Sequence, residues 1–214
     1  MARIRDAKGR EQADSGYVRL FGHEDLGMLL SRVHATLIRN GNELEELIKT
    51  RCPFHRSGLQ QRVMHTGQLL AFDEAIEVYF GEQINLGQGR PISSDAVILN
   101  HTDRTAVVVE IKDGDAFDTK KAQGEHDSMS RIAKWLGEML QYSVKIYFCC
   151  FNQKDKHTIL NGLKGRFSIE EVLTGREFCE MIAVDYDELC RAREADARDN
   201  LEYFTKQIKD CLDI

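Results

Sequence analysis

One segment constrains the fold of this chain more than any other, the run AVVVEIK over residues 106–112. Alternation along an extended strand places Glu110 and Lys112 on one face and Val107, Val109 and Ile111 on the other. A carboxylate and an ammonium at the end of an apolar strand are costly to bury without partners. The run therefore predicts a sheet strand that ends in a polar site.

Three further stretches have the β-branched composition and the bounding turn residues of strands, namely 83–86, 95–99 and 144–151. The last is apolar on both faces, which is typical of the centre of a sheet. Residues 100–104 (NHTDR) predict a hairpin turn between two of these strands. The sequence therefore predicts a three-strand meander followed by a buried strand.

Apolar residues at helical spacing predict helices over 24–39, 44–48, 66–80, 119–140, 169–173 and 186–211. Asn40-Gly41-Asn42 is interpreted as a helix stop, residues 49–62 as a basic loop, and the first 20 residues as mobile or draped over the surface. The expected class is α/β, with a mixed central β-sheet flanked by helices and helical additions at both termini.

A chain of 214 residues without a Pro- or Ser/Gly-rich linker fits a single domain over 1–214. We expect a basic helical subregion over 1–62, an α/β core over 66–165 and C-terminal helices over 166–214. No apolar run approaches the length of a membrane helix, and the N-terminus lacks the apolar stretch of a signal peptide. Six cysteines without zinc-ligand spacing indicate reduced thiols in a cytoplasmic protein.

The net charge of −6 argues against a nucleic-acid partner only when it is taken as a whole. Residues 1–62 hold 11 basic and 8 acidic residues, and residues 145–166 hold 5 and 1. The stretches 63–144 and 167–214 are acidic. The acidic centre could therefore be a metal site, while the two basic stretches are where DNA would bind.

Asp95 begins the strand before residues 106–112, and a hairpin through residues 100–104 would bring it near Glu110. Two carboxylates and Lys112 would then converge. Hard divalent ions such as Mg²⁺ bind one or two carboxylates together with phosphate and water, and a neighbouring lysine can orient or help to deprotonate the attacking water. The alternative is a structural ion pair at the end of a strand.

The spacing Asp95–x14–Glu110-Ile111-Lys112 resembles the PD-(D/E)xK nuclease motif, with Ser94 where the family name has proline. The stretch 112–125 is similar to the segment after the catalytic strand in some type II restriction endonucleases. Residues 173–179 and 184–186 resemble their C-terminal helical segment. The resemblance covers residues 70–210 and favours a restriction enzyme over a generic nuclease.

This resemblance implies a restriction-endonuclease-like core and a Mg²⁺-dependent enzyme, with Mn²⁺ as a substitute, that cuts double-stranded DNA at a short palindromic sequence and leaves 5′-phosphates. It implies that Asp95 and Glu110 hold the metal, with the Ile111 carbonyl as a third ligand, and that Lys112 positions the water. It also implies a homodimer, because cutting both strands of a symmetric target takes two sites.

Many members of the family add an acid from the helix before the sheet. Glu77 is preferred over Asp73 and Glu74 because it is nearest to the strand, and Glu125 has the spacing of an alternative acid. DNA contacts are expected from five basic residues, Lys120, Lys121, Arg51, Arg56 and Arg62. The alternatives for the whole chain are a repair or junction-resolving nuclease, or a DNA-binding protein that keeps the fold without catalysis.

Overall fold

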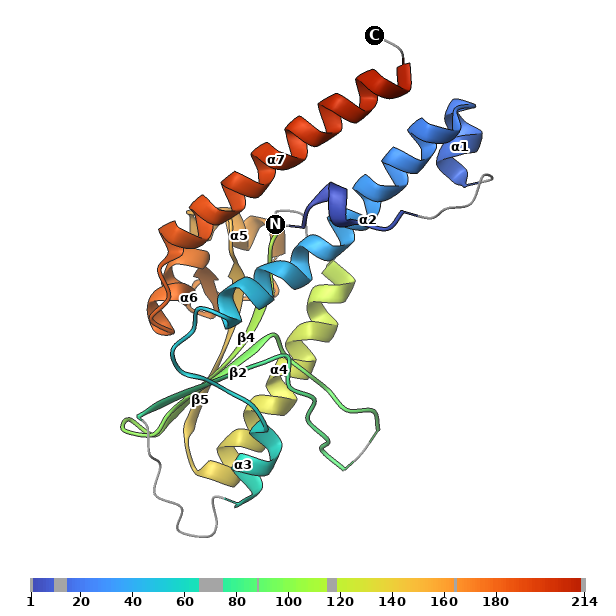
Figure 1. Ribbon diagram of the computed structural model, residues 1–214. Coiled ribbons are helices and arrows are strands. Elements are labelled where there is room, and N and C mark those ends of the chain that lie inside the picture. Colours follow the sequence, from blue (N-terminus) through green and yellow to red (C-terminus); the bar gives the residue numbers. More distant parts are fainter. Residues whose placement is uncertain are drawn as a thin grey trace. The chain divides into compact units, whose positions relative to one another are not determined.

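The computed structural model describes residues 2–9, 15–65, 75–87, 89–114, 119–163 and 165–212 (Figure 1). The chain forms two compact units. One comprises Met1–Leu47 and Asp187–Ile214, and the other comprises Ile48–Tyr186. Of the predicted N- and C-terminal helical additions, 1–62 and 166–214, only residues 1–47 and 187–214 belong to the first unit, and a single domain over 1–214 stays a prediction.

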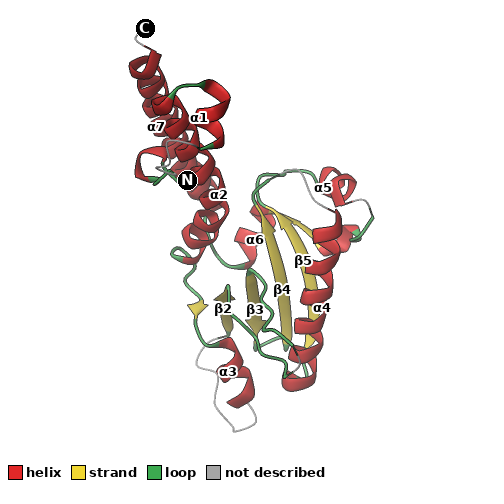
Figure 2. Cartoon of the chain, turned by 90° about the vertical axis from the view of Figure 1, so that its right-hand side faces the viewer, coloured by secondary structure: helices red, strands yellow, loops and turns green. Residues whose placement is uncertain are grey.

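The second unit is built on a sheet whose described strands are β1 (His55–Arg56), β2 (Ile76–Phe80), β3 (Ala96–Asn100), β4 (Thr105–Lys112), β5 (Ser143–Cys150) and β6 (Val172–Thr174). The strands lie in chain order, as Figure 2 shows for β2 to β5. Strands β2, β3 and β4 form an antiparallel meander, while β1 is parallel to β2 and both β5 and β6 run parallel to β4. The predicted α/β class with a mixed central sheet is confirmed.

The helices of this unit are α3 (Leu59–His65), α4 (Thr119–Leu140), α5 (Lys156–Leu163) and α6 (Gly175–Met181), with a 3₁₀ turn, η2 (Ile169–Glu171). Helix α4 has the predicted bounds and connects β4 to the parallel strand β5. Its apolar residues Met129, Ile132 and Leu136 are fully buried in one cluster with Ala106 and Val108 of β4. Helix α4 therefore covers one face of the sheet (Figure 2).

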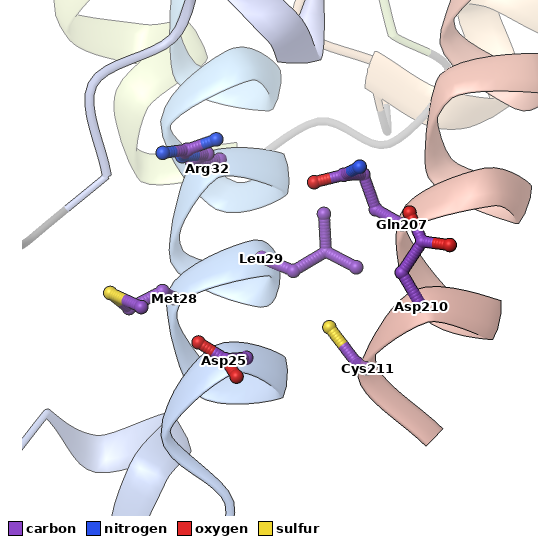
Figure 3. Close-up of a pocket in the computed structure, with 7 residues that line it drawn as sticks. All are labelled: Asp25, Met28, Leu29, Arg32, Gln207, Asp210 and Cys211. Atoms are coloured by element: carbon purple, nitrogen blue, oxygen red, sulfur yellow. The ribbon is translucent and has the colours of Figure 1, made fainter. Parts of the chain in front are cut away.

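The first unit contains η1 (Ile4–Asp6), α1 (Gly16–Phe21), α2 (Glu24–Lys49) and most of α7 (Tyr186–Leu212). Helices α2 and α7 border a hollow of about 310 Å³, into which Leu29 of α2 and Cys211 of α7 point (Figure 3). Arg32 Nη1 of α2 also donates a hydrogen bond to the Tyr203 hydroxyl of α7 (3.1 Å). This hydrogen bond links the two long helices.

The N-terminal segment is attached to α7 rather than only draped over the surface. Arg3 and Arg5 form ion pairs with Asp196 and Asp199, and the Asn200 side chain bonds backbone groups of residues 2 and 4. No helix in the described part of the chain is long and apolar enough to cross a membrane. All six cysteines are thiols that form no disulfide, as predicted.

Helix α2 is continuous, so the predicted stop at Asn40-Gly41-Asn42 is wrong. Thr36, Leu44 and Ile48 are buried at spacings of eight and four, so one buried face continues through the stop signal. Nothing lies within 4 Å of a Cβ added at Gly41, and one helical glycine costs only about 1 kcal/mol. The continuous buried face overrides that cost.

The helix predicted over 66–80 is wrong at residues 76–80, which form strand β2, and residues 66–74 lie outside the described residues. β2 lies between β1 and β3 and is buried on both faces, so its apolar pattern has no clear period. The loop predicted over 49–62 instead contains β1 and the start of α3, where Leu59 is buried.

The strand predicted over 83–86 is reduced to a single bridge between Ile84 and Ile92. The side chain of Gln60 in α3 bonds both the N–H and the C=O of Asn85, which are the groups that a strand would use. The helix predicted over 169–173 is a 3₁₀ turn followed by β6, which pairs with β5. Sheet pairing and side-chain contacts therefore decide the structure of these short segments.

A buried polar network surrounds Glu77 on β2. Its carboxylate accepts hydrogen bonds from Arg62 (2.9 Å) and from the Tyr79 hydroxyl (2.7 Å), and His101 Nε2 lies 3.2 Å away. The other ring nitrogen of His101 lies 2.9 Å from the Tyr142 hydroxyl. Burial alone would raise the pKa of Glu77, but the hydrogen bonds from Arg62, Tyr79 and His101 outweigh it and lower that pKa.

Replacing Gly175 by alanine should destabilise the protein by about 3 kcal/mol, because the added Cβ would lie 2.2 Å from the carbonyl oxygen of Phe151. The matched control is Gly137→Ala on α4, whose Cβ would meet nothing closer than 3.6 Å. Urea denaturation measures both free energies of unfolding. Equal stabilities for the two variants would contradict this account of Gly175.

Glu77→Gln should destabilise the protein at pH 7 by about 3 kcal/mol, since it leaves Arg62 beside a neutral amide. The folded-state pKa of Glu77 lies below its unfolded value near 4.5, so its contribution is present above that pH and is lost as the pH falls through the folded pKa. Urea denaturation from pH 7 down to about pH 2 should show the two proteins converging at the low end of this range. A constant difference in stability would refute this role of the ionised carboxylate.

Candidate active site

The candidate site lies at the end of β4. Ala106 and Val108 pack in the core beneath α4, so by alternation Glu110 and Lys112 lie on the same face of the sheet, beyond the last core residue. This confirms the predicted shared face of Glu110 and Lys112. The helix that follows β4 begins close by, because a β–α–β crossover returns along the face of the sheet from the end of its first strand.

The register of β3 against β4 brings Asp95 to this site. Ala96 lies opposite Val109, so Asp95, the residue before β3, lies beside Glu110, as the predicted hairpin requires. Asp95 Oδ2 accepts a hydrogen bond from the Ile111 N–H (2.6 Å). Asp95, on one side of the hairpin, is therefore a neighbour of Glu110 and Ile111 on the other side.

Lys112 lies between two carboxylates. Its ammonium forms ion pairs with Glu110 Oε1 and with Glu125 Oε1 of α4, the second at 3.0 Å. Glu125 is the acid that the sequence offered only as an alternative, with twelve residues between it and Lys112. The structure brings it to the site through the first turns of α4.

The electrostatics of the site reflect an excess of negative charge. Burial is the main cause that raises the pKa of Glu110 to about 7, the Asp95 carboxylate raises it further, and Lys112 opposes both. Burial alone would lower the pKa of Lys112, but Glu110, Asp95 and Glu125 together raise it above its ordinary value. Three carboxylates around one ammonium are not fully compensated in charge, so another cation could bind beside them.

Asp95, Glu110 and Glu125 line a depression of about 350 Å³ with Ser93, Gly124 and Ser128. Lys112 separates Glu110 from Glu125, and the described residues contain no group of three acidic, histidine or cysteine side chains placed to hold one metal ion. The arrangement fits a hard divalent ion held by two carboxylates and completed by other oxygens, in the manner of Mg²⁺.

The Ile111 carbonyl points to the edge of β4 that faces β3, where Asp95 lies. The Lys112 carbonyl accepts a hydrogen bond from Phe151 N (2.9 Å), on the β5 side of β4. Neighbouring residues in a strand point their backbone groups to opposite edges, so the N–H and C=O of Ile111 point toward the β3 side, where Asp95 accepts the N–H. The Ile111 carbonyl oxygen thus points to the edge of β4 on which the Asp95 carboxylate lies.

Glu77, the preferred extra acid, is not brought to this group. It lies opposite Leu99, four residues along β3 from Asp95, which corresponds to about 13 Å. Its carboxylate is engaged by Arg62, Tyr79 and His101. The preference for Glu77 rested on a helix that is a strand in the structure, and Asp73 and Glu74 lie outside the described residues.

The predicted DNA-binding residues lie on different elements. Lys120 and Lys121 occupy the first turn of α4, and their side chains lie outside the description. Arg56 lies on β1 and donates to the His55 carbonyl (2.7 Å), and Arg51 is partly buried after α2. Arg62 would have to leave a buried carboxylate to reach DNA.

Comparison with known proteins identifies a clear relative. No family model matches the chain. A solved structure of the SUMO protease Ulp1 with its catalytic cysteine oxidised to a sulfenic acid shares 14% identity, covering 79% of this chain and 77% of that one, at a TM-score of 0.24. That score is too low to support any argument.

The type II restriction enzyme HhaII from Haemophilus parahaemolyticus is 37% identical over 218 aligned positions, covering 97% of this chain and 94% of that enzyme. The match therefore includes the Asp95, Glu110 and Lys112 region and both compact units. This relative favours a restriction enzyme over a repair nuclease or a non-catalytic DNA-binding protein. The chain belongs to the type II restriction enzymes and is a site-specific DNA endonuclease.

Proposed function

We propose that this endonuclease cuts both strands of a short palindromic DNA sequence in a Mg²⁺-dependent reaction that leaves 5′-phosphates. The observation that carries the proposal is the convergence of Asp95, Glu110 and Lys112 at the paired ends of β3 and β4. Type II restriction enzymes generally use a divalent metal ion, and this is the part of the molecule that fits one.

In this proposal Asp95, Glu110 and the Ile111 carbonyl hold Mg²⁺. Bound there, the ion would lower the pKa of a water molecule and neutralise charge on the scissile phosphate. The chain's own contribution is rigid placement of the ligands, since the Ile111 N–H fixes one oxygen of Asp95 and the sheet fixes the backbone. Mn²⁺, which accepts the same oxygen ligands, would substitute.

Lys112 would orient the attacking water and stabilise the charge that develops on the phosphate. Its ammonium is held by Glu110 and Glu125, two carboxylates that line the depression, so its position beside them is fixed. Glu125 then acts as a positioning residue for Lys112. Attack by water with departure of the 3′-oxygen, which takes up a proton, leaves a 3′-hydroxyl on one fragment and a 5′-phosphate on the other.

The described part of the chain holds one such site, while two strands must be cut. A homodimer with two-fold symmetry places two sites on a target of the same symmetry, which supports a homodimer and a palindromic sequence. We expect DNA contacts from Lys120, Lys121, Arg51 and Arg56, which would neutralise phosphates. The six cysteines form no disulfide, which supports the cytoplasm, a reducing compartment, as the proposed location.

Plasmid DNA incubated with the protein and Mg²⁺ should give discrete fragments, and DNA ligase should rejoin them because they carry 5′-phosphates. Mn²⁺ should support cleavage, and removal of divalent ions with EDTA should stop it, because the carboxylates then have no ion to present. Gel electrophoresis before and after ligation measures all three. A smear, or cleavage that persists in EDTA, would contradict the proposal.

Lys112→Ala should lower the cleavage rate by about 10³-fold, the order expected for loss of a group that handles the attacking water. DNA binding in Ca²⁺ should be retained, since this variant keeps the carboxylates. The control is Lys134→Ala on α4, an exposed lysine paired with Glu138. Cleavage by Lys112→Ala at the rate of the control would remove Lys112 from the mechanism.

A further inference from the structure

Gly124 of α4 borders the proposed active site. No packing contact in the described chain requires a glycine at this position. Gly124 lines the same depression as Asp95, Glu110 and Glu125, and a Cβ added to it would meet nothing within 4 Å. Glycine is the least favourable residue in a helix interior apart from proline. The position is therefore one where alanine would stabilise the folded chain.

The other glycine of α4 behaves differently. A Cβ at Gly137 would lie in ordinary contact, 3.6 Å from the carbonyl oxygen of Tyr142, so that glycine packs against the chain. Gly124 instead faces open space on the side where the carboxylates lie. An occupant from outside the described chain would use this space, and in an endonuclease the strand that must reach these carboxylates is the substrate.

Ser128 lies one turn further along α4 and lines the same depression. Its hydroxyl makes no hydrogen bond with the residues that the structure describes, and it is the only described side-chain hydroxyl that α4 presents there. A phosphate next to three carboxylates is repelled, and uncharged donors can hold it without adding another ion pair. A hydroxyl beside an open glycine offers both room and a hydrogen bond.

We propose that Gly124 and Ser128 form the wall of the active site against which the DNA backbone lies, Gly124 by leaving room for the strand and Ser128 by donating a hydrogen bond to a phosphate oxygen. This inference rests on the proposed active site. Glu125, between them in sequence, holds Lys112, so the same two turns of α4 position the lysine and receive the strand.

The test compares stability with cleavage in the full-length protein. Gly124→Ala and Gly124→Leu should raise the melting temperature, by about 2 °C for alanine, while the leucine lowers the single-turnover cleavage rate in Mg²⁺ about 100-fold. The matched control is Gly41→Leu on α2, in the other compact unit, where an added Cβ also meets open space. It should be stabilised equally and cleave the plasmid at the wild-type rate.

Ser128→Ala should cleave about 10-fold more slowly, and Ser128→Thr, which keeps the hydroxyl, should recover most of the rate. The control is Ser130→Ala, on the same helix but lining a different hollow, beside β5. In all variants the melting temperature shows that the protein is folded, so a slow rate reports on the site and not on unfolding.

Wild-type rates for folded Gly124→Leu would overturn the inference. Should that variant unfold, Gly124→Ala decides instead: a rate about 10-fold below wild type supports the inference, since even a methyl group intrudes on the strand, and an unchanged rate overturns it. Lys112→Ala separates a failure of this inference from a failure of the proposed active site. If Lys112→Ala is inactive while Gly124→Leu is active, only this inference fails, and if Lys112→Ala is active, the proposed active site fails and this inference with it.

Discussion

The candidate site depends on one constraint, the pairing register of β3 and β4. With Ala96 opposite Val109, Asp95 lies beside Glu110 and its carboxylate can accept the Ile111 N–H. A shift of one residue would turn Asp95 to the opposite face of the sheet, away from both Glu110 and Lys112. The short turn between the strands fixes this register through the Asn100 side chain, which bonds both the backbone and the side chain of Asp103.

The same register explains why charged residues are tolerated at the edge of a core. Each of the two strands contributes apolar residues to the cluster beneath α4 and then a carboxylate just beyond it. Glu110 and Lys112 compensate one another at the boundary, and Glu125 adds a second partner for the ammonium. The remaining negative charge is what a divalent cation would neutralise. The repulsion between carboxylates that destabilises the site without a cation would therefore favour binding of that cation.

The sequence predicted the α/β class, α4, α7, β5 and the approach of Asp95 to Glu110, because these follow from long periodic segments and one short hairpin. It failed where tertiary contacts decide the local structure. Burial of β2 on both faces removes its period, so a helix is predicted there, and this error placed Glu77 near the predicted metal site. Glu125 carried a spacing signal, but only the return of α4 along the sheet shows that it reaches Lys112. No local pattern could supply that contact.

Helix α4 thus has two segments with different requirements. Met129, Ile132 and Leu136 are fully buried and fix the helix on the sheet, and their spacing made the helix predictable. Its first turns extend past the apolar cluster to the depression beside the carboxylates, where core packing no longer selects the residues. In the proposed site these residues would contact the substrate instead, which would account for a poor helix former such as Gly124 at this position. A rigid helix anchored by its buried segment can in this way hold its polar segment at hydrogen-bonding distance from a reacting phosphate.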